Sequence, residues 1–97
     1  MLTLRIVTKQ GTSQSIECDS VHLSVVDDVL GEGGGSMGIR TGHIRSLISV
    51  DKGPVTAYLN GKEIFSANVG VGFATVENDT VTIVTERMQN AECRMQN

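Results

Sequence analysis

Alternation of apolar and polar residues with a period of two is the feature that most constrains the fold of this chain. Residues 2–8 read LTLRIVT, and residues 21–26 repeat the alternation. Successive side chains on a β-strand point to opposite faces, so this pattern is typical of strands with one buried face. Residues 80–85, TVTIVT, are the last clear strand. Helical periodicity is nearly absent, and only residues 85–97 could form a short helical tail.

Two dipeptides place hairpin turns between predicted strands. Asn60-Gly61 separates strands at 55–59 and 62–67, and Asn78-Asp79 separates strands at 69–76 and 80–85. Asn-Gly and similar pairs favour two-residue hairpins because these residues adopt positive φ readily. Further short strands are expected at 15–18, 37–40 and 44–50.

These features predict an all-β fold, a flattened β-sandwich or barrel of about eight to ten short antiparallel strands. The 97 residues allow one domain, which we place at 1–87, followed by a short polar tail at 88–97. With 39% hydrophobic and 20% charged residues, the chain has the balance of a folded domain. The expected core comprises Leu4, Ile6, Leu23, Val25, Ile39, Leu47, Val55, Leu59, Phe65, Val71, Phe73, Val76, Val81 and Ile83.

Several function classes are not expected from this composition. Eight basic against eleven acidic residues, with one Tyr and two Phe, disfavour a nucleic-acid binder. No apolar run approaches the eighteen residues of a membrane span. The glycine-rich loop at 27–36 leads into GGGSMG at 33–38, a literal GxGxxG, but no helix follows to hold a pyrophosphate. We therefore expect no nucleotide site.

The residues that usually carry chemistry are few and scattered. Cys18 and Cys93 form no clustered pattern and are expected to be free thiols in a reducing, cytoplasmic setting. The only histidines, His22 and His43, have no second ligand at metal-binding spacing. We expect no cofactor, no metal and no catalytic residue. Such an inventory is typical of a binding or assembly module.

Four short segments, taken together, resemble one known family. Residues 36–43, SMGIRTGH, are similar to the Gly-Leu/Ile-x-Pro-x-His segment of the ε subunit of F-type ATP synthases. Lys52-Gly53 stands where that family has a turn, GVGF at 70–73 is similar to its Gly-Gly stretch, and NDTVTIV at 78–84 is similar to its last hairpin. The order and spacing match from residue 2 to about residue 88.

This chain departs from the family pattern at several positions and would be a divergent member. Thr41 replaces the usual Pro, Ile44 and Arg45 replace a small residue and Pro, and Val71 splits the Gly pair. The family normally adds a C-terminal helical hairpin, which would begin near Asn97. By the resemblance, the chain would be either a naturally short or a shortened form without this hairpin.

The resemblance implies a ten-stranded sandwich at the foot of the central stalk. It would be a non-catalytic subunit that couples the γ subunit to the c ring during proton- or sodium-driven ATP synthesis. It would lie on the cytoplasmic face of the energy-transducing membrane, peripheral and without a span of its own. The segment 36–49 would supply the contacts, with Ser36, Met37, Arg40, Thr41, Gly42, His43 and Arg45 as partner-binding residues. The structural glycines would be Gly38, Gly42, Gly70 and Gly72.

Two other interpretations remain open from the residues alone. One is a stand-alone β-sandwich that binds a small ligand, which a deep pocket would favour. The other is an enzyme in which the fold unites Cys18 or the glycine loop with His43. An exposed apolar sheet face would instead favour the stalk subunit.

Overall fold

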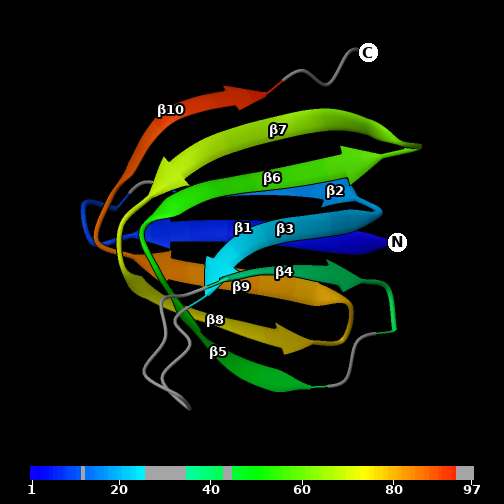
Figure 1. Ribbon diagram of the computed structural model, residues 1–97, viewed down its shortest axis with the longest axis horizontal. Helices are drawn as coiled ribbons and strands as arrows, with labels where there is room; N and C mark the ends of the chain where they lie inside the picture. The colour runs from blue at the N-terminus through cyan, green and yellow to red at the C-terminus, as the bar shows by residue number, and fades with distance from the viewer. Residues whose placement is uncertain (12, 26–34, 43–44, 94–97) are drawn as a thin grey trace.

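The computed structural model describes residues 1–11, 13–25, 35–42 and 45–93 of the chain. Its regular structure is entirely β (Figure 1). No helix in the described part is long and apolar enough to cross a membrane. The strands are β1 Leu2–Thr8, β2 Ser13–Cys18, β3 Ser20–Val25, β4 Gly35–Arg40, β5 Ser46–Val50, β6 Gly53–Leu59, β7 Lys62–Val69, β8 Gly72–Glu77, β9 Thr80–Thr85 and β10 Met88–Cys93.

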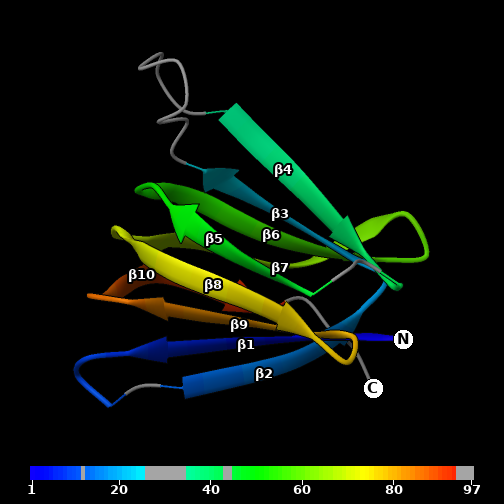
Figure 2. The same ribbon diagram turned by 90° about the horizontal axis from the view of Figure 1, so that it is seen from below.

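One curled sheet makes both layers of the sandwich. Its strand order is β10-β7-β6-β3-β5-β8-β9-β1-β2, and β4 pairs with β3 off this path. A single residue pair, Val25↔Val50, joins β3 to β5, and the sheet folds over at this point (Figure 2). The all-β sandwich predicted from the sequence is confirmed. One pairing differs from the antiparallel prediction, because β1 runs parallel to β9.

Both predicted hairpin turns are present. Asn60 and Gly61 have φ of 54° and 79° between β6 and β7, and Asn78 and Asp79 have φ of 53° and 56° between β8 and β9. Two consecutive positive φ values are the signature of a type I′ turn, whose twist matches that of the flanking strands. These turns set the register of the two hairpins.

The core lies between the two layers and is built from alternate residues of the strands. Phe65 is its largest fully buried side chain, and Cys18 is buried among the aliphatic residues. The buried apolar residues are Leu2, Leu4, Ile6, Ile16, Cys18, Val21, Leu23, Ile39, Ile48, Val50, Val55, Ala57, Ile64, Phe65, Ala67, Val69, Ala74, Val76, Val81 and Ile83.

Three residues expected in the core lie on the surface instead. Leu47 is 75% exposed, and Val71 and Phe73 are each 47% exposed. On β5 the inward positions belong to Ile48 and Val50, which leaves Leu47 on the outer face because side chains alternate.

On β8 the pairing partners fix which residues point inward. Ala74 and Val76 pair with the buried Ile83 and Val81 of β9. Phe73 therefore points outward, where it lies opposite Val84, and not into the core as expected. Val25 and Leu59, also expected in the core, are only partly buried and pack against it.

Part of the segment expected to be a polar tail, Met88–Cys93, is a strand. β10 pairs antiparallel with β7, with a register shift between Gln89 and Glu92. The backbone groups of β10 are satisfied by pairing with the edge of β7, and this pairing does not depend on the polarity of the side chains. The side-chain composition of the segment therefore does not reveal the strand.

The four expected structural glycines have different environments. Gly42 adopts φ of +87°, a conformation that L side chains rarely take, and a Cβ on Gly72 would collide with the Val84 carbonyl oxygen. A Cβ on Gly38 or Gly70 would meet its nearest neighbour at the ordinary contact distances of 3.5 and 3.7 Å. Geometry therefore requires glycine at Gly42 and Gly72 and not at the other two positions.

Candidate partner-binding surface

The predicted partner segment follows the outer margin of one layer. Ser36 and Met37 lie on β4, Arg40 ends that strand, and Thr41 and Gly42 form the turn after it. Apart from Met37, which is half-buried against the core, these residues are exposed, and so is Arg45. His43 and Ile44 lie outside the described residues.

The turn after β4 meets the β8–β9 turn, and together they form what we call the Arg45 corner: Gly42, Arg45, Glu77 and Asp79. The Gly42 N–H donates a hydrogen bond to Oδ1 of Asp79 at 2.9 Å. Arg45 Nε lies 3.7 Å from Glu77 Oε1, with the two side chains 81% and 54% exposed. Such an exposed ion pair contributes at most about 1 kcal/mol to stability, so the guanidinium remains available to a partner.

An apolar patch lies on the outer face of the neighbouring strands, at residues that the sequence analysis did not assign to a contact surface. Phe73 pairs with Val84, Val84 pairs with Val7, and Leu47 pairs with Thr75 beside Phe73 on β8. Leu47, Phe73, Val84 and Val7 together are called the Phe73 face below. The inward-facing Ile83 and Ile6 set the outward direction of the two valines. Leu47 and Phe73 are exposed and the two valines are half-buried. Apolar side chains gathered on an outer face are a mark of an interaction surface.

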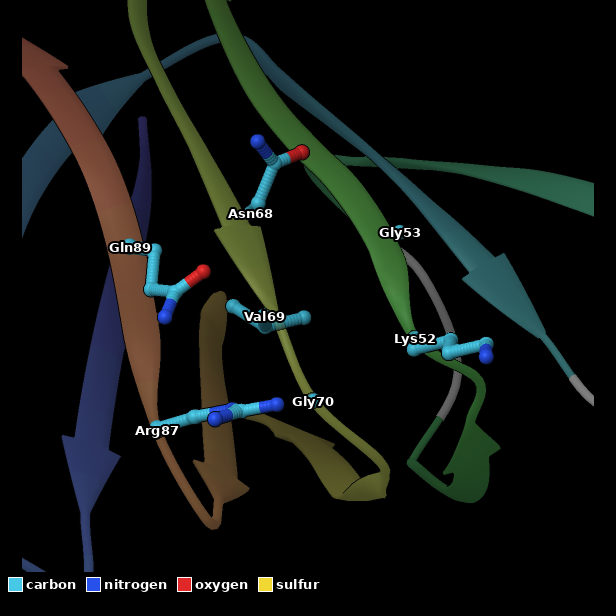
Figure 3. Close-up of a pocket in the computed structure, with 7 residues that line it drawn as sticks. All are labelled: Lys52, Gly53, Asn68, Val69, Gly70, Arg87 and Gln89. Atoms are coloured by element: carbon cyan, nitrogen blue, oxygen red, sulfur yellow. The ribbon is translucent and has the colours of Figure 1, made fainter.

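The depressions in the described surface are open rather than deep. One is lined by Lys52, Asn68, Val69 and Arg87 together with neighbouring residues, and Figure 3 shows the Lys52 side chain extending away from Arg87. The two cations therefore do not converge on one point.

A second depression lies on the outer face of β3, β4 and β6, where the His22 and Tyr58 rings meet edge to face at 5.2 Å beside Arg40. Within the described ranges, no three His, Cys, Asp or Glu side chains are placed to hold a metal ion.

The Cys18 thiol is buried in the core and is not poised as a nucleophile. Burial raises the pKa of this thiol to about 11 from its ordinary value of 9.0, and the nearby Asp19 carboxylate adds to the increase. At neutral pH the group is therefore a neutral, hydrophobic core residue. The Cys93 side chain lies outside the part that the structure describes.

We expect the raised pKa to make stability depend on pH between about 9 and 11. The folded state favours the neutral thiol, so this stability is fully present below pH 9 and is lost as the pH rises towards 11. Urea unfolding of the wild type and of Cys18→Ala, measured from pH 8 to 11, checks this expectation. The difference between their free energies of unfolding removes the contribution of every titrating group that the two proteins share. A difference that stays constant over this range would contradict it.

The fold and its surfaces define a class of protein. This is a small β-sandwich domain with two candidate contact surfaces, the charged Arg45 corner and the apolar Phe73 face, whose chemistry suits binding to other macromolecules.

The comparison with family models identifies the family. Residues 1–91 match the β-sandwich domain of the ATP synthase delta/epsilon chain, and the chain belongs to this family. The family resemblance stated from the sequence is confirmed.

Curated relatives agree with this assignment. The chain is 31% identical over 91 residues to an ATP synthase epsilon chain from Synechococcus sp. (strain JA-2-3B'a(2-13)), an alignment that covers 94% of this chain and 61% of the relative. It is 35% identical over 86 residues to an ATP synthase epsilon chain from Hydrogenobaculum sp. (strain Y04AAS1), covering 89% and 57% respectively. The chain thus spans about six tenths of the length of these relatives.

A solved structure shows the same fold. A chain in the cryo-EM structure of the Euglena gracilis mitochondrial ATP synthase, OSCP/F1/c-ring in rotational state 1, superimposes with a TM-score of 0.69. The match has 18% sequence identity and covers 90% of this chain and 51% of that chain.

Proposed function

We propose that this domain is a non-catalytic central-stalk element of an F-type ATP synthase, where it couples the γ subunit to the c ring during ATP synthesis. The observation that carries the proposal is a set of exposed residues, presented at the margin of a sandwich of the delta/epsilon family: Ser36, Arg40, Thr41, Gly42 and Arg45. The domain would be peripheral, on the cytoplasmic face of the energy-transducing membrane. A mechanical coupler needs a stiff scaffold with contact surfaces, and two tight hairpins in one continuous sheet supply that stiffness.

The Arg45 corner supplies a directional polar contact. The cation is anchored through Nε beside Glu77, and a guanidinium can grip a partner carboxylate through two parallel hydrogen bonds. Charges at the rim of an interface act chiefly on the association rate and on its salt dependence. This corner would therefore steer assembly.

The Phe73 face supplies apolar surface that a bound partner would remove from water. Phe73 and Leu47 are large apolar side chains on adjacent strands, and both are exposed. Aromatic residues are enriched at the buried centre of protein interfaces. The exposed apolar sheet face is the feature that separates the stalk subunit from a stand-alone ligand-binding sandwich, and it supports the former.

Reversing one charge tests the proposal. We expect Arg45→Glu to weaken co-purification with γ and the c ring at least tenfold and to make the remaining association less dependent on salt. The free energy of unfolding of the isolated domain should change by less than about 1 kcal/mol, because the residue is exposed. Binding is measured by pull-down at 50 and 300 mM salt.

Lys9→Glu is the matched control. Lys9 is exposed and follows β1, whose end lies at the opposite side of the molecule from the end of β4 (Figure 1). This control should assemble like the wild type. If Arg45→Glu combined with His43→Ala assembles as well as the control, the partner surface lies elsewhere.

A further inference from the structure

β4 is an edge strand with a regular backbone. Within the described residues it pairs with β3 alone, in an unbroken register that runs from Ser20↔Arg40 to Val25↔Gly35. Figure 2 shows it at the outer margin of its layer. The far side of this strand therefore presents backbone groups to which another strand could bond.

The hydrogen bonds of β3 show which groups of β4 face outward. The Asp51 N–H donates to the Ser24 carbonyl at 3.0 Å, so the backbone of Ser24 faces β5 and β6. Backbone groups alternate along a strand, so those of Leu23 and Val25 face β4.

On β4, the residues opposite Leu23 and Val25 must then direct their backbone N–H and C=O groups towards β3. The residues between them must direct theirs away from β3. Leu23 pairs with Met37, and Val25 pairs with Gly35. The backbone N–H and C=O groups of Ser36, Gly38 and Arg40 therefore point to the unpaired side.

The two ends of the main strand path are less suitable for strand addition. β10 carries a register shift between Gln89 and Glu92, and β2 lies against β6 across the sandwich. Irregular or covered edges discourage the addition of a strand. β4 reads GSMGIR, with no Pro or Lys and no register shift to blunt its edge.

We propose that β4 is a docking edge to which an extended segment of the γ subunit adds as a further strand of the sheet; this rests on the proposed function. The added strand would place its side chains in line with those of β4. Met37 is half-buried on the core side, and Arg40 is exposed on the outer side with no ion pair to a described residue. The segment would therefore carry an apolar residue beside Met37 and a carboxylate beside Arg40.

Charge favours this occupant over a second copy of the chain. Two copies pairing antiparallel about Gly38 would place Arg40 opposite Ser36 of the other copy, with no carboxylate to meet the guanidinium. Each copy also carries a net charge of −3, so association would bring like charges together. A partner strand with an acidic residue supplies the carboxylate that a second copy lacks at this position.

Two substitutions at one position test the inference. Ser36→Pro removes the outward N–H and leaves the bonds between β3 and β4 in place, since proline is tolerated at an edge position that faces solvent. Ser36→Ala removes only the hydroxyl. We expect Ser36→Pro to bind purified γ at least tenfold more weakly than Ser36→Ala, which keeps the outward N–H.

Amide hydrogen exchange on the wild type tests the same inference without a variant. Binding of γ should slow exchange at Ser36, Gly38 and Arg40 by at least tenfold, because their N–H groups become bonded. Unchanged exchange at these amides in a formed complex would overturn the added strand.

The remaining outcomes separate this inference from the proposed function. Equal binding of γ by the proline and alanine variants overturns the added strand and leaves the stalk function standing. Failure of the wild type to bind γ overturns both. A wild-type dimer in sedimentation equilibrium that Ser36→Pro dissociates would assign the edge to a second copy and overturn the proposal.

Discussion

Truncation of Phe65 to Ala is expected to remove about 3–5 kcal/mol of stability. Phe65 is fully buried and is the largest side chain in the core, so its loss leaves a cavity that the surrounding strands cannot close. A domain of this size has about 5–15 kcal/mol in total, so the loss is a large share of its stability. Urea denaturation of the isolated domain measures the change.

The other phenylalanine of the chain is the matched control. Phe73 is 47% exposed, so Phe73→Ala should cost at most about 1.5 kcal/mol, half the value for a fully buried side chain. The same substitution should weaken assembly with γ and the c ring if the Phe73 face is a contact surface. Equal losses of stability at the two positions would contradict the register of β8 and β9.

The two phenylalanines show how well the burial of a side chain can be predicted from the alternation along a strand. Strand existence, the two hairpins and part of the core follow from period-two patterning and turn residues. Hydrophobicity alone assigns Phe73 to the core, and this assignment was wrong. Val76 shares its inward face with Ala74, so the alternation within β8 already excludes Phe73 from that face. The small Ala74 gave too weak a signal to outweigh the large aromatic ring.

Pairing between strands that are distant in the sequence could not be predicted from local patterns. The parallel contact of β1 with β9 joins Leu4 to Val81, across most of the chain, and no turn encodes it. The strand at Met88–Cys93 was missed for a related reason, since its stability comes from the edge of β7 rather than from its own side chains. Long-range backbone pairing depends on the folded sheet as a whole.

The candidate surface was predicted in part. The exposed position of Arg40, Thr41 and Arg45 agrees with a polar segment bounded by glycines. The corner itself needs Glu77 and Asp79, which come from the far hairpin and could be placed only by the fold. The roles of these residues in binding remain predictions for the assembly experiments.

Gly72→Ala is expected to destabilise the domain by about 3 kcal/mol, the upper part of the range for overpacking. A Cβ at this position would collide with the Val84 carbonyl oxygen and lie 2.9 Å from the Thr85 Cα. Both are backbone atoms, which cannot rotate aside as a flexible side chain can. Relief of the collision therefore requires β8 to move away from β9, where Gly72 pairs with Thr85.

Gly70→Ala separates this steric cost from the general cost of replacing glycine. Its Cβ would lie 3.7 Å from Thr85 Oγ1, an ordinary contact, so we expect a change below about 1 kcal/mol. Thermal and urea unfolding of the two variants measure the difference. Because the movement of β8 would also shift Phe73 against Val84, Gly72→Ala should weaken partner binding even where the domain remains folded. A Gly72→Ala domain as stable as Gly70→Ala would show that β8 does not approach β9 as closely as the structure places it.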